Sequence, residues 1–314
     1  MLVQKKYLIN FYLALFSFFI LGLFAVRNPF LISDGDNYVM HATLDIDFSL
    51  AVFFTSPLYW FIVKLVSIDP LLFPSLLSLL IAFFISLSAL KLKPIEIIIF
   101  IFFIIVNPIF FTTFELALRN GLALSIFIFL VVYKKDKLTP FVCLIHPGIL
   151  PVVFLYLALK YLNFSFRNIV VFISLIFGFI FLFDNYFSVL LEVRGYSDID
   201  DNNSANFLTY LFFFFLSFIY YKSFNNVMKF YMPLFFIFWV FLGLSMPFAA
   251  RVFVQAVPFF VILIFLYSEN NFFKKLFLFV MVVFSILLAL KSHDFIIYNS
   301  GWVDTWVSLF YRYF

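Results

Sequence analysis

The sequence predicts an all-α polytopic membrane protein, with about nine full spans and a re-entrant pair of half-helices, hence about 11 membrane helices. The first observation is composition: 66% of the 314 residues are hydrophobic, 11% are charged and the mean hydropathy is +1.15. A soluble domain carries about 25% charged residues, so this chain has too little polar surface to cover itself in water. The other observations are long apolar runs and the clusters of lysine that separate them.

The apolar runs have the length of about 20 residues that crosses a hydrocarbon core. The first run follows Lys5 and Lys6 and could imitate a signal peptide, but no small-residue cleavage site comes after it. We therefore interpret it as the first span. The expected full spans are 7–26, 71–90, 95–114, 117–133, 168–184, 207–221, 230–248, 252–268 and 275–290.

The basic clusters orient these spans, because cytoplasmic loops carry an excess of Lys and Arg. Lys5 and Lys6 place the N-terminus in the cytoplasm. The later clusters expected on the same side are Lys91/Lys93, Lys134/Lys135/Lys137, Lys160/Arg167, Lys222/Lys229 and Lys274/Lys275. All of them can be cytoplasmic only if two further apolar segments, 48–67 and 138–160, do not cross the membrane.

Each of these two segments contains a helix breaker. Segment 138–160 holds His146-Pro147-Gly148 and then Pro151, which predicts a re-entrant pair of half-helices against protein or a water-filled cavity. Segment 48–67 is interrupted at Ser56-Pro57 and is expected to be an outer-face helix in the membrane interface. The chain is thus predicted to be a single transmembrane domain, 1–314, with outer loops 27–70 and 184–206.

Five of the six arginines fall on the outer side, where the positive-inside rule disfavours basic residues. They are Arg27, Arg119, Arg194, Arg251 and Arg312. The formal net charge is only +4 and the basic residues form no patch, so no nucleic-acid partner is expected. Cys143 is the single cysteine and lies in an apolar stretch, which excludes a disulfide framework within the chain. The arginines expected on the outer side therefore need another explanation.

The first candidate feature is the loop after the first span, Ser33-Asp34-Gly35-Asp36-Asn37-Tyr38. Two carboxylates beside a glycine can bind a divalent cation, or one of them can act as a general base. The alternative is a solvated turn, because Asp and Gly are common turn residues. From the spacing alone, all of these interpretations stay open.

The second feature is Glu115-x-x-x-Arg119-Asn120-Gly121, at the outer end of two expected spans. Glu115 and Arg119 would form an i, i+4 pair if the turn is helical. A guanidinium at the start of a span needs an anionic partner, and its fork of N–H groups matches phosphate oxygens. The alternative is an ion pair that holds a helical hairpin.

The remaining features are a histidine and two arginines. His146 lies at the break in 138–160 and can donate to a phosphate or carry a proton, or it is simply a core residue. Arg251 follows Phe248-Ala249-Ala250 at the outer end of a span, where the alternative is an arginine that reaches to lipid headgroups. Arg194 lies in the acidic and aromatic loop 184–206, which suits carbohydrate without being specific for it.

Several short stretches, in order along about residues 27–268, carry a resemblance to a known family. They are Asp36-Asn37-Tyr38, Ser56-Pro57-Leu58-Tyr59-Trp60, Leu118-Arg119-Asn120-Gly121-Leu122-Ala123, Ile145-His146-Pro147-Gly148, and Ala250-Arg251-Val252-Phe253 with Pro258. In these stretches the chain resembles the EpsG/Wzy group of bacterial polysaccharide polymerases. The first loop also looks like the acidic loop of the wider GT-C glycosyltransferases, which implies a GT-C-like helical bundle. Asn120 departs from the pattern, because many relatives have Gln after the arginine.

The resemblance implies a polymerase of O-antigen or related repeat units, in lipopolysaccharide or other surface polysaccharide biosynthesis. Donor and acceptor would both be glycans on undecaprenyl diphosphate. Asp36, Asp34 and His146 are then the expected catalytic residues. The expected substrate-binding residues are Arg119, Arg251, Tyr38, Asn120, Glu115 and Arg194. No cofactor is expected, although the Asp34/Asp36 pair would suit a divalent cation.

The expected location is the bacterial inner membrane, with many spans, the N-terminus in the cytoplasm and the active site in the periplasm. A chain-length regulator is a further potential partner beside membrane lipid. The alternatives are a GT-C transferase that uses a polyprenyl-phosphate sugar donor, a ligase that joins polymer to lipid A core, and a flippase or transporter of lipid-linked oligosaccharide. A transporter would place ionisable residues at the bilayer midplane and often has two similar halves, and the sequence shows no convincing internal repeat.

Overall fold

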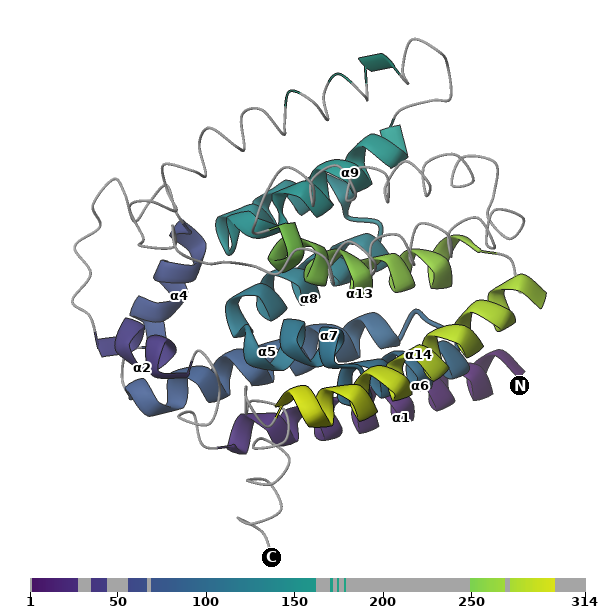
Figure 1. Cartoon of the computed structure of the whole chain (residues 1–314), viewed down its shortest axis with the longest axis horizontal. Coiled ribbons are helices and arrows are strands. Elements are labelled where there is room, and N and C mark those ends of the chain that lie inside the picture. The colour runs from purple at the N-terminus through teal and green to yellow at the C-terminus, as the bar shows by residue number, and fades with distance from the viewer. Residues whose placement is uncertain are drawn as a thin grey trace, which may run out of the picture. The chain divides into compact units, whose positions relative to one another are not determined.

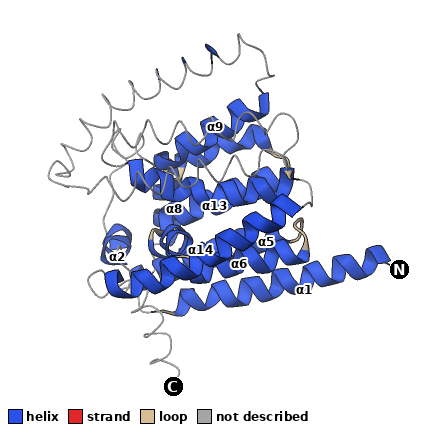
Figure 2. Ribbon diagram, turned by 45° about the vertical axis from the view of Figure 1, so that its right-hand side comes forward, coloured by secondary structure: helices blue, strands red, loops and turns tan. Residues whose placement is uncertain are grey.

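A computed structural model of the chain describes residues 2–27, 35–43, 56–66, 69–161, 249–268 and 272–296, with isolated positions at 170, 171, 174 and 178. The elements in these ranges are helices, and no strand occurs among them (Figures 1 and 2). The spans expected at 207–221 and 230–248, most of 168–184, and the loop 184–206 lie outside the described residues.

The chain forms two compact units. The first contains Met1–Val153, Val257–Leu266 and Leu278–Phe314, and the second contains Phe154–Ala256 and Tyr267–Phe277. The predicted site residues whose side chains the structure describes all belong to the first unit. The expectation of a single transmembrane domain stays a prediction.

Long apolar helices confirm that the chain belongs to the class of helical membrane proteins. Within the described residues, three are long and apolar enough to cross a membrane: Tyr7–Val26, Pro70–Ala89 and Phe272–Leu290. A fourth crossing is added if the bent pair Pro94–Val106 and Pro108–Leu116 counts as one span. The described part of the chain therefore supports the class but not the full count of about nine spans expected from run length.

The core of the first unit is a stack of helices joined by apolar contacts. Helix α1 (Leu2–Gly22) continues into η1 (Leu23–Val26) and packs along α5 (Phe73–Ala89), which follows η3 (Pro70–Leu72). The other side of α5 packs along α8 (Leu118–Val132). Helix α14 (Phe272–Ile296) carries the last of the candidate spans.

The expected span 95–114 is a bent pair of helices rather than one continuous helix. The run is divided into α6 (Pro94–Val106), α7 (Pro108–Phe111) and the π-helical segment η4 (Thr112–Leu116), with a bend of 81° at the break. Pro108 has no N–H to continue α6, and the Asn107 side chain accepts a hydrogen bond from the Ile109 N–H at 2.9 Å, which starts the new helix. Asn107 also donates to Ser285 Oγ at 2.8 Å, so the bend is fixed from α14.

The helix α8 agrees with the expected span 117–133 and ends in a complete C-terminal cap. Lys134 has a positive φ of 58°. The Lys134 N–H donates to Val131 O at 3.0 Å, and the Lys135 N–H donates to Leu130 O at 2.7 Å. This pair of bonds is a Schellman motif, which satisfies carbonyls that a helix end leaves open.

The segment 138–160 is broken at His146, as predicted, although its halves differ from expectation. The first half is the 3₁₀ segment η5 (Asp136–Leu144), followed by the short η6 (Pro147–Ile149) and α9 (Leu150–Tyr161). Pro151 is not a breaker in mid-run, because it occupies the first turn of α9, where no N–H is needed. The re-entrant path itself stays a prediction.

Two short helices gather at the end of the first unit that lies away from the N-terminus, at the left of Figure 1. They are α2 (Gly35–Thr43) and α4 (Pro57–Val66). The helix α4 begins directly after Ser56, so the break at Ser56-Pro57 is a helix start, and residues 48–55 lie outside the described residues. The helix α13 (Ala249–Tyr267) covers the expected span 252–268 except for its last residue, and it continues through Pro258.

Candidate functional site

The candidate site lies where α2 and α4 meet the start of α8. The described side chains among the predicted site residues are Asp36, Tyr38, Glu115, Arg119, Asn120 and His146. Arg251 belongs to α13, but its side chain is not among those described, and Asp34 and Arg194 lie outside the described residues. The proximity of Arg251 and Arg119, which the sequence analysis expects, therefore stays a prediction.

An aromatic cluster, defined by Tyr38, His41, Tyr59 and Trp60, joins α2 to α4. His41 Nδ1 and Tyr59 Oη are 3.0 Å apart and share a hydrogen bond. The His41 ring centroid lies 4.8 Å from that of Trp60, and the rings of Tyr59 and Trp60 are 5.2 Å apart. Tyr59 is fully buried, whereas Trp60 and His41 are partly exposed. The cluster is thus buried at Tyr38 and Tyr59 and partly exposed at His41 and Trp60.

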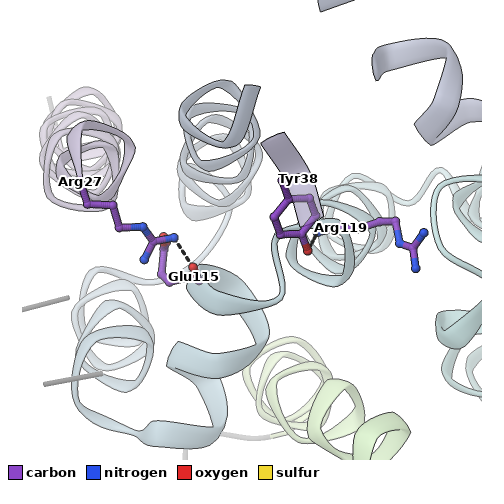
Figure 3. A network of polar contacts seen from close by, with 4 residues as sticks. All are labelled: Arg27, Tyr38, Glu115 and Arg119. Atoms are coloured by element: carbon purple, nitrogen blue, oxygen red, sulfur yellow. Dashed lines mark hydrogen bonds and ion pairs between the residues drawn. The ribbon is translucent and has the colours of Figure 1, made fainter. Parts of the chain in front are cut away.

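The Arg119 side chain contacts this aromatic cluster. Its guanidinium carbon is 5.2 Å from the centroid of the Tyr59 ring, which is a cation–π contact. Its backbone N–H donates to Tyr38 Oη at 3.1 Å. The side chain is partly exposed and, among the described residues, forms no hydrogen bond or ion pair with a carboxylate. Figure 3 shows the guanidinium pointing away from both Tyr38 and Glu115. The N–H groups of Arg119 are thus available to an anionic ligand.

The expected i, i+4 pair of Glu115 and Arg119 does not form. Glu115 Oε2 instead lies 3.6 Å from Nη2 of Arg27, and the same Nη2 donates to the backbone carbonyl of Glu115. Both side chains are buried, with exposed fractions of 1% and 0%. The prediction assumed a regular α-helix, whereas η4 is π-helical and the chain breaks at Ala117 before α8 begins. This break turns Arg119 away from Glu115, and the buried carboxylate does not reach a surface ligand in this structure.

Asp36 occupies the first turn of α2 and is exposed, as is Asn37. Among the described residues its carboxylate takes part in no hydrogen bond or ion pair, so it can accept a proton from a ligand. Tyr38 follows two residues later and holds the Arg119 N–H, which ties the helix of Asp36 to the turn of Arg119. No group of three or more metal-ligating side chains gathers within the described residues, and Asp34 lies outside them.

Gly121 allows the start of α8 to approach η4. A Cβ at this position would lie 2.8 Å from the carbonyl oxygen of Phe114 and 2.9 Å from Cδ1 of Ile81. Real Cβ atoms do not approach backbone so closely, so the Arg-Asn-Gly sequence is a packing requirement as well as a candidate site. Asn120 is partly exposed between Arg119 and this contact.

His146 lies between η5 and η6 and is partly exposed. Its ring covers Gly148, where an added Cβ would lie 2.5 Å from Nε2 of His146. The segment η5 starts beside Lys134 at one end of α8, packs along α8 and also contacts α4. The chain that leads to His146 therefore extends toward the end that holds the aromatic cluster.

The sequence alone gives no role to Arg27, His41, Tyr59 or Trp60. Tyr59 and Trp60 stand in one of the stretches that carry the family resemblance, and Arg27 is one of the arginines expected on the outer side. Those two signals could have drawn attention to them. The contacts that give them roles join residues 18 to 88 positions apart, which spacing alone does not reveal.

Comparison of the chain with protein-family models, with curated proteins and with solved structures finds no match. The resemblance to the EpsG/Wzy group is therefore carried by the quoted residues alone.

Proposed function

We propose that the chain polymerises undecaprenyl-diphosphate-linked oligosaccharide repeat units into O-antigen or a related surface polysaccharide, at the periplasmic face of the bacterial inner membrane. One observation carries the proposal: Arg119 is held by Tyr38 and Tyr59, has no carboxylate partner among the described residues, and lies close to the helix of an exposed Asp36. A cation on a turn that is joined to the helix of an exposed carboxylate suits a reaction in which an anion departs and a hydroxyl loses its proton.

In this reaction the acceptor hydroxyl attacks C1 of the donor sugar, and the bond from C1 to the diphosphate oxygen breaks. The diphosphate leaves with the electron pair of that bond, so negative charge develops on it. The Arg119 fork can hold two of its oxygens, because the guanidinium is partly exposed and has no carboxylate partner among the described residues. Asp36 takes the proton of the acceptor hydroxyl.

Other predicted residues complete the proposed site. Arg251 is the second cation for the diphosphate, Arg194 contacts the glycan, and His146 donates to a diphosphate oxygen. Asn120 is adjacent to Arg119 and partly exposed, so it can contact the same headgroup. Because diphosphate is already a good leaving group, the reaction requires no metal.

The proposal includes a GT-C-like bundle of about nine full spans and a re-entrant pair, with a cytoplasmic N-terminus. Its support in the first unit is the separation of charges along α8. The lysines at residues 134, 135 and 137 follow the end of the helix, whereas Arg119 and the elements α2 and α4 are at its start. Three lysines at one end, and Arg119 with the exposed Asp36 at the other, are the distribution expected of a cytoplasmic and a periplasmic end, although α4 also carries Lys64.

The test is complementation of a strain that lacks the gene, with polysaccharide length scored on a gel. Arg119→Ala, Asp36→Ala and Arg251→Ala are each expected to abolish the ladder and leave a single repeat unit on the core. Lys137→Ala is the matched control, because Lys137 is an exposed cation after the opposite end of α8. Its ladder should keep the normal length.

Normal ladders from all three site variants, at membrane levels equal to the unmodified protein, would remove the proposal. Loss of even the single repeat unit would instead indicate a ligase. Accumulation of a repeat unit that lacks one sugar would indicate a transferase that uses a polyprenyl-phosphate donor.

A further inference from the structure

The break between η4 and α8 is held at two points, one by Arg27 and one by Tyr38. Arg27 ends the segment that follows the first span, and Tyr38 lies on α2, so the two residues bracket the loop with Asp34 and Asp36. Arg27 contacts Glu115, before the break, and Tyr38 contacts Arg119, after it (Figure 3). The loop and the Arg119 turn are thus joined twice across 81 and 88 positions of sequence.

The first attachment is a poor device for stability alone. Arg27 and Glu115 are enclosed, their ionic contact is 3.6 Å long, and neither carboxylate oxygen of Glu115 accepts a hydrogen bond within the described residues. Removing two charges from water costs more than such a contact returns, and an apolar pair of similar volume is often at least as stable. The pair does fix the position of Arg27 relative to the π-helical segment, because Arg27 also donates a hydrogen bond to the backbone carbonyl of Glu115 near the end of that segment.

The second attachment acts as a helix cap. The first N–H groups of a helix have no partner inside it, and the residue before α8, Ala117, has no side chain that could accept from them. Tyr38 Oη accepts from the Arg119 N–H and is itself buried, with an exposed fraction of 5%. Tyr38 of α2 therefore caps the start of α8, a role that a local Ser, Thr, Asp or Asn usually has. A cap from so far away fixes α2 relative to α8.

We propose that Arg27, Glu115 and Tyr38 are positioning residues that set the separation between the Asp36 carboxylate and the Arg119 guanidinium. The inference rests on the proposed function, in which one group takes the proton and the other stabilises the leaving diphosphate. Both events belong to the transition state, so a change in the separation lowers kcat more than it raises KM. Tyr38 then acts through Arg119 rather than by contact with the substrate.

The test uses full-length protein in lipid vesicles with an undecaprenyl-diphosphate-linked repeat unit as substrate. Tyr38→Phe removes one hydroxyl and should lower kcat about tenfold at nearly constant KM, by loss of one hydrogen bond. Arg27→Lys keeps the charge but loses the fork and should lower kcat up to about 100-fold through misplacement of the site. Tyr133→Phe is the matched control, because it removes one hydroxyl that donates to Leu87 O at 3.1 Å at the other end of α8.

A second readout does not depend on activity. Nitroxide labels at Asn37→Cys and Asn120→Cys, in a Cys143→Ser background, report the distance between α2 and the Arg119 turn. The distance distribution should broaden in Tyr38→Phe and stay narrow in Tyr133→Phe. Variants that elute as a single species in detergent are the ones compared.

Unchanged kcat and an unchanged distance distribution in Tyr38→Phe and Arg27→Lys would overturn the positioning role. If Arg119→Ala is inactive at the same time, the proposed function survives that result. If the unmodified protein polymerises nothing, the proposed function fails, and the label distances still decide whether the two attachments position the turn. Equal losses in Tyr38→Phe and Tyr133→Phe would also overturn the role, since they would show a general effect of hydroxyl removal.

Discussion

The two ends of the α5–α8 pair hold polar side chains in opposite ways. At the end with Lys91 and Lys93, Asn10 donates to the carbonyls of Leu90 at 3.1 Å and Leu92 at 3.0 Å. Lys93 is half exposed, and its partner Glu96, at 3.9 Å, is three residues away. At the other end, Arg27 and Glu115 are enclosed and 88 positions apart.

The comparison distinguishes contacts that satisfy backbone groups at a helix end from contacts that fix the relative position of two distant segments. Asn10 and Glu96 satisfy backbone groups, and the charge of Lys93 stays half exposed to water although the Glu96 side chain is buried. The arginine end removes charges from water and joins segments distant in sequence, at a cost that folding alone does not require. We therefore expect a functional site at the end of the helix pair where charges are buried.

The largest predicted effect breaks the buried pair. Arg27→Ala should lower the free energy of unfolding by about 3–5 kcal/mol, because it leaves the Glu115 carboxylate buried without its cation. The double variant Arg27→Met with Glu115→Leu should recover most of that stability while polymerisation stays impaired. Thermal unfolding in detergent measures the first effect and the gel ladder the second. Equal stability of the single variant and the unmodified protein would show that the pair is not enclosed.

The next effect tests the close approach at the arginine end. Gly121→Ala should cost about 1–3 kcal/mol, because its Cβ would overlap the Phe114 backbone at 2.8 Å. Gly22→Ala is the control, since its Cβ would meet only Leu79 Cδ2 at an ordinary 3.8 Å. The control should be neutral or slightly stabilising, as Ala favours helix over Gly. Melting temperatures that shift equally for the two variants would contradict the packing argument.

A smaller effect is expected at the lysine end. Asn10→Ala removes two hydrogen bonds to the carbonyls of Leu90 and Leu92, and should cost about 1 kcal/mol. The polysaccharide ladder should keep its normal length, in contrast to variants of the arginine end. Shortened chains in this variant, at unchanged protein level, would erase the contrast between the two ends.

The smallest effect is a gain of stability. Lys134 adopts a φ of 58°, a conformation that glycine adopts without strain. Lys134→Gly should therefore raise the free energy of unfolding by up to about 1 kcal/mol. Lys135→Gly serves as the comparison, because Lys135 has a negative φ of −95° and should gain nothing. A destabilised Lys134→Gly would mean that the lysine side chain itself supports the turn.

The run of apolar residues predicts the candidate spans of α1 and α5 well, because length and hydrophobicity decide whether a segment can cross a bilayer. The helix α8 agrees with its expected bounds but has only 15 residues, fewer than such a span needs. It fails at Asn107-Pro108, where the apolar run continues across a helix break. The Asn-Pro pair is a known turn signal and was outweighed by the hydrophobicity around it. The break at His146-Pro147-Gly148 was predicted because two breakers stand together there.

The candidate site was predictable in part. The positive-inside rule drew attention to the outer arginines, including Arg27 and Arg119, without showing their partners. The predicted pairing of Glu115 with Arg119 was wrong. A spacing of four residues brings side chains together only in an α-helix, and residues 112–116 are π-helical. The contacts of Tyr38 and Tyr59 with Arg119 depend on how three helices meet, which one sequence does not encode in any local pattern.

The bend at Asn107 also has a consequence for the surrounding bilayer. Helix α6 has 13 residues and is about 20 Å long at 1.5 Å per residue, which is shorter than a hydrocarbon core of about 30 Å. The 81° turn then carries the chain nearly crosswise toward Glu115. A bilayer answers such hydrophobic mismatch by thinning locally. Lipid phosphates beside this hairpin are therefore expected to lie deeper than elsewhere.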